Sequence, residues 1–183
     1  YKENGLMGVG EYLNPFFTPI DITGTNIAAW YDASDETTLF QNTACTTPVT
    51  SNGQDVACWK DKSPNFNDMT QLAPSSVPVY ASGTTSVNFD GTDDYMDAIS
   101  QTGVPLGTSA RTTFMSAAAD SFANPGFNYI FSYGDSLASQ GSQHFGFDDS
   151  DCQYNDFYST GGNCVSTGTQ FMFSRYFDGT NAG

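Results

Sequence analysis

The chain contains few residues of several types on which helical folds and many active sites depend. Its 183 residues include three glutamates, one histidine and five lysines plus arginines. Glu, Lys and Leu, the usual residues of surface helices, are scarce, and no window shows a sustained apolar period near 3.6 residues. No apolar run approaches the roughly 18 residues of a membrane-spanning helix. The sequence therefore argues against a helical bundle and predicts no transmembrane segment.

Basic residues are too few to balance the acidic ones. Five Lys plus Arg stand against 20 Asp plus Glu, which gives a formal net charge of −15. A surface of this charge repels phosphate backbones and anionic membranes, which argues against nucleic-acid binding. Most of the acids are Asp, the residue of turns and calcium loops. Two explanations remain open: the acidity of a soluble secreted protein from a saline habitat, or a specific cation-binding role.

Cysteine is also rare, and its spacing is informative. The four cysteines form two close pairs, Cys45 with Cys58 and Cys152 with Cys164, and neither pair has the C-x-x-C spacing of zinc or redox sites. We predict two local disulfides, each contributing about 3 kcal/mol by restricting the unfolded chain. Disulfides persist in oxidising compartments, so we expect a secreted or cell-surface protein whose leader has been removed.

The abundant residues are those of strands and turns. Aromatic residues make up 15% of the chain, and Thr, Ser and Gly are frequent. Short strand-like segments alternate with turn sequences such as Asn52-Gly53 and Gly161-Gly162. The expected strands cover residues 27–31, 56–59, 77–80, 86–89, 94–98, 112–118, 129–133, 144–147, 156–158 and 170–177. This pattern predicts an all-β fold, an antiparallel β-sandwich of the jelly-roll type.

One stretch predicts a hairpin. Val87 and Phe89 precede Asp90-Gly91, a turn sequence, and Tyr95 and Met96 follow it. Because these apolar residues favour strands, we expect two paired strands with one buried face and an acidic turn.

Three motifs, in this order, resemble those of the laminin G-like, concanavalin A-like lectin domains. They are Ala29-Trp-Tyr-Asp-Ala-Ser-Asp35, Trp59-Lys-Asp-Lys-Ser63 and Val87-Asn-Phe-Asp-Gly-Thr-Asp-Asp-Tyr-Met-Asp97. The resemblance covers about residues 22–179 and implies a jelly-roll sandwich in an extracellular setting. The residues that we expect to anchor the core are Trp30, Trp59, Phe89 and Tyr95. The alternative for the two tryptophans is an exposed platform on which a sugar stacks.

The chain departs from these lectin-like domains at two places. Pro64-Asn65-Phe66 follows Ser63, where the lectin-like domains usually have glycines. Since Pro64 and Phe66 stand at the two glycine positions and do not tolerate positive φ, we expect the loop to differ locally. After Asp178-Gly179 the further strands usual in these domains are missing, which predicts a fold that ends differently, a fragment, or an open sheet edge that something else fills.

We expect residues 1–21 to form an N-terminal arm or linker ahead of a domain at residues 22–183. Glycines and the prolines Pro15 and Pro19 argue against a helix there. The region is nevertheless too apolar for a free linker. We expect it to lie on its own domain or to dock onto a neighbouring copy. The apolar residues of this arm are Leu6, Val9, Leu13, Phe16 and Phe17.

Catalytic patterns are missing from the sequence. Laminarinase-type enzymes of the concanavalin-like fold carry E-x-D-x-x-E on one strand, and none of the three glutamates lies in that pattern. A Ser-His-Asp site would have to use His144 as its only base, and no G-x-S-x-G surrounds a candidate serine. We conclude from the sequence that the protein has no catalytic residues and is not an enzyme.

Calcium is the more credible chemistry, because hard cations bind carboxylate oxygens on loops. The first candidate cluster lies around Cys152 and comprises Asp148, Asp149, Asp151 and Asp156. Four close carboxylates repel each other unless a cation or solvent offsets them, so this cluster is our candidate metal site, with surface charge as the alternative. The second cluster comprises Asp90, Asp93, Asp94 and Asp97, and turn-forming roles explain it without a metal.

Aromatic residues beside amide or carboxylate groups are the composition of a carbohydrate site. Such a group follows Cys152 and comprises Tyr154, Asn155, Phe157 and Tyr158. Two functional classes then remain. The first is an extracellular recognition or adhesion module that binds glycan or protein through its end loops. The second is a repeating structural subunit of a filament, appendage or particle, in which copies assemble through the arm and open sheet edges.

Overall fold

The computed structural model describes residue 19 and residues 26–98, 100–106, 109–120, 128–134, 142–147, 152–155, 159–164 and 167–177. In that part of the chain almost all regular structure is strand, and every strand pairing is antiparallel. The all-β prediction is therefore confirmed. The chain divides into two compact units, Tyr1–Val104 and Pro105–Gly183.

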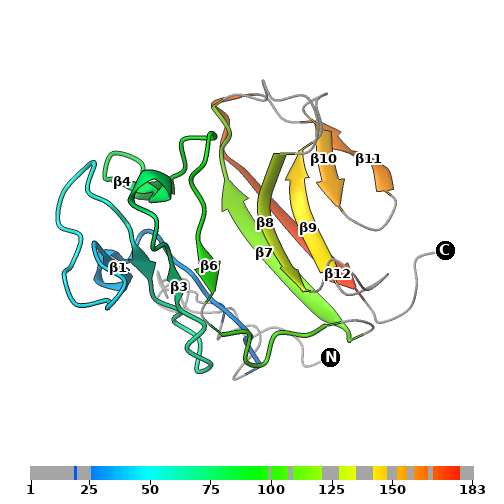
Figure 1. Ribbon diagram of the computed structural model, residues 1–183. Helices are drawn as coiled ribbons and strands as arrows, with labels where there is room; N and C mark the ends of the chain where they lie inside the picture. The colour runs from blue at the N-terminus through cyan, green and yellow to red at the C-terminus, as the bar shows by residue number, and fades with distance from the viewer. Residues whose placement is uncertain are drawn as a thin grey trace, which may run out of the picture. The chain divides into compact units, whose positions relative to one another are not determined.

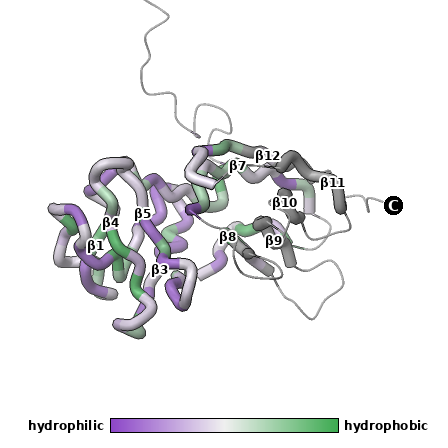
Figure 2. Tube along the Cα trace, turned by 90° about the horizontal axis from the view of Figure 1, so that it is seen from above, coloured by the Kyte–Doolittle hydropathy of each residue, from purple (hydrophilic) through white to green (hydrophobic). Residues whose placement is uncertain are grey.

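The first unit is built from very short strands (Figure 1). A four-stranded sheet contains, in spatial order, β1 (Leu39–Phe40), β2 (Cys58–Trp59), β3 (Met69–Thr70) and β6 (Asp97–Ala98). A separate hairpin pairs β4 (Val79–Ala81) with β5 (Ser86–Asn88). Two single-turn 3₁₀ helices, η1 (Glu36–Thr38) and η2 (Pro74–Ser76), interrupt the loops. Hydrophobic and hydrophilic residues are interspersed along this unit in Figure 2.

A small apolar core holds the first unit together. Its buried members are Leu39, Val49, Val56 and Tyr80, and the partly buried Trp59, Val87 and Met96 pack against them. The Tyr80 hydroxyl donates a hydrogen bond of 2.7 Å to Glu36 Oε1, which satisfies the polar end of a buried ring. Because two-residue strands supply few ladder bonds, loops and side chains must position much of this unit.

The predicted hairpin around Asp90-Gly91 is wrong. Strand β5 pairs with β4, and β6 pairs with β3, so the segments on the two sides of the turn do not pair with each other. The intervening chain is held instead by the Asp94 carboxylate, which accepts from the Asp90 amide at 2.9 Å, and by the Tyr95 amide, which donates to Ser76 O at 3.2 Å. These contacts bend the chain away from the pairing that its apolar residues favour.

The four expected core anchors behave differently from one another. Trp59 packs against the core cluster, and Trp30 is partly buried. Phe89 and Tyr95 are exposed by 42% and 51%, so the prediction that they anchor the core is wrong for these two rings. Both lie outside the strands, on the irregular segment between β5 and β6.

The second unit has longer strands. Strand β7 (Arg111–Ala117) pairs with β12 (Phe171–Phe177) along all seven residues of each. A four-stranded sheet contains, in spatial order, β11 (Ser159–Cys164), β10 (Cys152–Asn155), β9 (Ser142–Phe147) and β8 (Asn128–Gly134). The guanidinium of Arg111, a buried residue, lies 5.8 Å from the centre of the Tyr133 ring, so a residue of β7 contacts a residue of β8 across the two sheets.

Candidate functional site

The second motif supplies a buried carboxylate that acts as a structural hub. Asp61 Oδ1 accepts from the backbone amides of Trp30 and Ser63, both at 2.8 Å. Its Oδ2 accepts from Ser63 Oγ at 2.6 Å and from the Asn67 amide at 2.9 Å. A buried carboxylate is tolerated when hydrogen bonds satisfy its lone pairs, and these four donors do so. Asp61 therefore fastens loops together and has little capacity left for a ligand.

Asn67, whose backbone amide binds Asp61, connects this buried group to Thr102, near the end of the first unit. Its side chain, 1% exposed, donates from Nδ2 to the carbonyls of Ala28 and Thr102, both at 2.9 Å. The Tyr31 hydroxyl donates to the Asn67 carbonyl. Burial raises the pKa of Tyr31, and the nearby carboxylates of Asp61 and Asp68 raise it further. The first motif is thus tied to the segment after the second.

Lys62 joins the first two motifs by charge. Its Nζ lies 2.7 Å from Asp35 Oδ2 and 3.1 Å from Asp32 Oδ2, and 4.5 Å from the centre of the Trp30 ring. Partial burial opposes ionisation of Asp32, but hydrogen bonds from Ser34 and Lys62 outweigh it and lower the pKa of Asp32. The hydrogen bond from Lys62 also lowers the pKa of Asp35. The polar residues of both motifs are therefore engaged with one another.

The third motif carries a different arrangement, in which acids and aromatic rings face solvent. Carboxylate oxygens of Asp90, Asp93 and Asp94 lie within 4.8 Å of one another. Asp90 Oδ1 accepts from the amides of Thr92 and Asp93, at 2.8 and 3.3 Å. These backbone hydrogen bonds, that from Thr92 foremost, lower the pKa of Asp90. The carboxylate of Asp90 thus shapes the turn, as the sequence suggested, and Gly91 supplies its positive φ of 74°.

This turn and its two flanking rings form what we call the acidic aromatic loop, residues 89–95. Phe89 and Tyr95 stand at its ends, and both rings are exposed. Asp93 and Asp94 lie between them, and Asp93 Oδ2 also accepts from Ser76 Oγ at 3.2 Å. Exposed rings beside carboxylates match the composition expected of a carbohydrate site. Because both rings were expected in the core, this combination of exposed rings and carboxylates was not predicted from the sequence.

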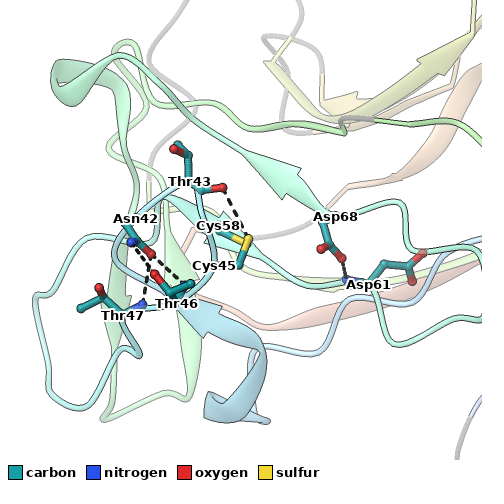
Figure 3. The surroundings of a disulfide bond; sticks show 8 residues. All are labelled: Asn42, Thr43, Cys45, Thr46, Thr47, Cys58, Asp61 and Asp68. Carbon is teal, nitrogen blue, oxygen red and sulfur yellow. Dashed lines mark hydrogen bonds between the residues drawn. A yellow bond between two sulfur atoms is a disulfide. The ribbon is translucent and has the colours of Figure 1, made fainter.

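The predicted Cys45–Cys58 disulfide is confirmed, with Cα atoms 5.6 Å apart (Figure 3). The loop between the two cysteines is ordered by Asn42, whose Oδ1 accepts from the Thr46 and Thr47 amides at 3.0 and 3.1 Å. Asp68 lies with an oxygen within 4.8 Å of both sulfurs. Since a disulfide has no thiolate to offer a metal, this group is a staple and not a metal site.

The second predicted disulfide falls on strands whose side chains lie outside the described residues. Cys152 and Cys164 are directly opposite one another across β10 and β11. The backbone of Tyr154 and Asn155 belongs to β10. The other predicted positions outside the described residues are Asp148, Asp149, Asp151, Asp156, Phe157 and Tyr158, together with the arm residues Leu6, Val9, Leu13, Phe16 and Phe17.

The loop after the second motif contains a residue that the sequence analysis did not select. Phe66 has φ of +56° and is 75% exposed. Phe66 therefore takes a positive φ although its side chain disfavours one, and a loop that differs from that of the lectin-like domains stays a prediction. Asn65 explains the positive φ, because its Nδ2 donates to the carbonyls of Ile27 and Ala28, both at 3.0 Å, and fixes the turn. The available signal was a large ring at a position where the resemblance to lectin-like domains led us to expect glycine.

No protein-family model, curated protein or solved structure matches the chain. Among the described residues, no helix has the length and apolar character required to cross a membrane. The acidic aromatic loop and the other exposed apolar residues are therefore the features from which a function can be inferred.

Proposed function

We propose that the chain is a non-catalytic, extracellular β-sandwich module of the jelly-roll type that binds glycan or protein through its loops. The observation that carries this proposal is the acidic aromatic loop, where the exposed rings of Phe89 and Tyr95 flank clustered carboxylates. The rings offer faces on which a sugar stacks, and carboxylates accept hydrogen bonds from its hydroxyls. The Cys45–Cys58 disulfide supports the extracellular setting, because such bonds persist in oxidising compartments.

A calcium ion forms part of this proposal. The acidic aromatic loop supplies oxygens from Asp90, Asp93 and Asp94, of which Asp90 already accepts two backbone hydrogen bonds. The acids of the segment at residues 148–156 are the other source of hard oxygen ligands. A calcium ion held by either cluster would bridge the protein carboxylates and the hydroxyls of a sugar.

A glycan array probed with the fluorescently labelled full chain, with and without calcium, tests the recognition proposal. Phe89→Ala and Tyr95→Ala should each reduce the signal at least about tenfold, because each removes a stacking face. Leu72→Ser is the matched control, since Leu72 is also a strongly exposed apolar residue but lies outside the loop. Absence of any glycan signal, or equal signals from all variants, would contradict glycan recognition by this loop.

A second candidate function is that of a repeating structural subunit of an extracellular filament, appendage or particle. The observation that favours it is an exposed face on β7 and β12 that bears Phe114 and Met172, exposed by 57% and 80%. Exposed apolar groups on a sheet face of a highly charged protein are typical of contact surfaces. Sedimentation velocity and negative-stain imaging of the purified chain test this function. A monodisperse monomer at all concentrations and salt levels would contradict it.

A further inference from the structure

The two cysteines of the Cys45–Cys58 disulfide differ in their access to solvent. Cys58 lies on β2, between β1 and β3, and is 0% exposed, whereas Cys45 is partly exposed on the loop that precedes this strand. A thiol reductant reacts with a disulfide as the thiolate and has to reach one of the two sulfur atoms. Because Cys58 is covered, the thiolate can attack only at Cys45.

Attack at Cys45 determines the course of the reaction. The thiolate forms a bond to Cys45 Sγ, the bond between the two cysteine sulfurs breaks, and its electron pair leaves with Cys58 Sγ. A second thiol then displaces Cys45 from the mixed disulfide, so that two reductant molecules are oxidised to one disulfide and both cysteines become thiols. The departing Cys58 sulfur therefore carries negative charge in a buried position, and burial disfavours a charged group.

A carboxylate lies beside this reaction path (Figure 3). Asp68 has a carboxylate oxygen within 4.8 Å of both sulfur atoms. Its Oδ1 accepts a hydrogen bond of 2.9 Å from the Asp61 amide, which holds the side chain in position. The Thr43 carbonyl oxygen, the negative end of a peptide dipole, lies 3.6 Å from Cys45 Sγ. The groups around the disulfide thus oppose the arrival and the formation of negative charge.

Among the described residues, no cation forms an ion pair with Asp68. Lys62 is paired with the acids of the first motif, and Lys60 Nζ lies 4.8 Å from the centre of the Phe40 ring. The net charge of −15 on the whole chain repels anions at longer range. An anionic thiolate is therefore opposed both by the local charge of Asp68 and by the charge of the chain.

We propose that Asp68 protects the Cys45–Cys58 disulfide from reduction by anionic thiols, of which glutathione is the representative. The carboxylate repels the incoming thiolate and destabilises the negative charge that is spread over three sulfur atoms during the exchange. The disulfide that joins the loop around Cys45 to the buried strand β2 thereby persists in the presence of thiols. This protection does not depend on what the loops of the chain bind.

Reduction of the full chain by glutathione tests the proposal. Trapping with iodoacetamide followed by peptide mapping measures the rate at Cys45 and Cys58 separately from the rate at the second predicted pair. Asp68→Asn keeps an oxygen for the Asp61 amide and removes the charge. It should speed the reduction at least about threefold, because two unit charges about 4 Å apart interact by more than the thermal energy even in water.

Three comparisons distinguish repulsion by charge from a loosened fold. Cysteamine carries an ammonium group that offsets its thiolate, so Asp68→Asn should speed its reaction less than that of glutathione. Sodium chloride at about 1 M shortens the Debye length to about 3 Å and should reduce the effect seen with glutathione. Asp120→Asn removes the same charge from an exposed position of the second unit and should leave the rate unchanged.

Asp68→Glu retains the charge and should remain as resistant to glutathione as the unaltered chain. Equal rates for Asp68→Asn and the unaltered chain overturn the proposal. Equal acceleration with glutathione and cysteamine, or an acceleration that salt does not reduce, shows that Asp68 acts through the fold and overturns it too. Reduction of Asp68→Glu as fast as that of Asp68→Asn has the same meaning.

Discussion

Asn67 and Thr102 exchange two hydrogen bonds, from Asn67 Nδ2 to the Thr102 carbonyl and from the Thr102 amide to Asn67 Oδ1, both at 2.9 Å. The side-chain amide of Asn67 pairs with the Thr102 backbone as the peptide group of a neighbouring strand would, because it has one donor and one acceptor in a similar arrangement. The same Nδ2 reaches the Ala28 carbonyl, so one side chain connects three segments that are distant in sequence. The first unit, whose strands are very short, depends on such side-chain connections.

We therefore expect Asn67→Ala to be among the most destabilising single substitutions in the first unit. It removes the hydrogen bonds of Asn67 to the Thr102 amide and to the carbonyls of Ala28 and Thr102 from a buried site, at a cost of about 2–4 kcal/mol in the free energy of unfolding. The Ala28 carbonyl still accepts from Asn65 Nδ2, and the Thr102 amide still reaches Ser100 Oγ. Urea unfolding followed by tryptophan fluorescence measures this loss. Asn88→Ala, at an exposed position of β5, is the control and should cost less than about 0.5 kcal/mol. Equal midpoints for both variants would contradict the role of Asn67.

The pairing of Lys62 with Asp32 and Asp35 predicts a component of acid sensitivity. Folding lowers the pKa of both carboxyl groups, so their stabilisation is complete above about pH 4, the unfolded value, and is lost as pH falls through the folded values. Burial lowers the pKa of Lys62, but the hydrogen bonds that its ammonium donates to Asp35 and Asp32 outweigh burial and raise it, so its contribution is lost only above about pH 10.5. Since all three groups are partly exposed, we expect the two ion pairs together to contribute about 0.5–1 kcal/mol to the free energy of unfolding.

Melting curves of the unaltered chain and of Lys62→Gln between pH 6 and pH 3 measure this component. The difference in melting temperature between the two proteins should shrink as the pH falls, because acid removes the interaction that Lys62→Gln already lacks. Other carboxylates affect both proteins alike and cancel in this comparison. A constant difference across the range would show that the ion pairs contribute nothing.

The sequence indicated the long strands β7 and β12 and the short strands β2, β4, β5 and β6, but it missed the two-residue strands β1 and β3 and the six-residue strand β11. Strands β7 and β12 have seven residues each, enough for alternation and aromatic content to be recognised. Strands β1 and β3 have two residues each and carry no period. The segment at residues 27–31 was expected to be a strand but forms none, because its polar backbone groups bond to the side chains of Asp61, Asn65 and Asn67.

The candidate sites were harder to predict than the fold class. Aromatic residues fill the cores of most β proteins, so Phe89 and Tyr95 were assigned to the core by type. Whether a ring is covered depends on strand pairing between distant segments, and the pairing of β6 with β3 leaves these two outside. Phe66 was missed similarly, since its conformation is imposed by hydrogen bonds of its neighbours and not by its own preference.

The second disulfide is the next prediction. Cys152 and Cys164 are directly opposite in antiparallel strands, where Cα atoms lie about 4.5–5.5 Å apart, within the range that a disulfide spans. Non-reducing peptide mapping should therefore recover Cys152 linked to Cys164 and Cys45 linked to Cys58. Free thiols at residues 152 and 164, or a crossed pairing, would contradict it and weaken the extracellular proposal.

Calcium binding predicts a change in stability when the ion is removed. A ligand that binds only the folded state stabilises it by about 2.7 kcal/mol at a hundred times its dissociation constant, so a chelator should lower the melting temperature and excess calcium should restore it.

The chain offers two acidic clusters, and substitutions separate them. If the segment at residues 148–156 holds the ion, Asp148→Asn/Asp149→Asn should abolish the response and Asp93→Asn should preserve it; the acidic aromatic loop predicts the reverse. Each Asp→Asn substitution removes one negative charge and so weakens the repulsion among the acids of the chain. Asp55→Asn, at an exposed acid outside both clusters, measures this general effect on the melting temperature. A melting temperature that chelator leaves unchanged in the unaltered chain would contradict calcium binding at either cluster and leave these acids as surface charge.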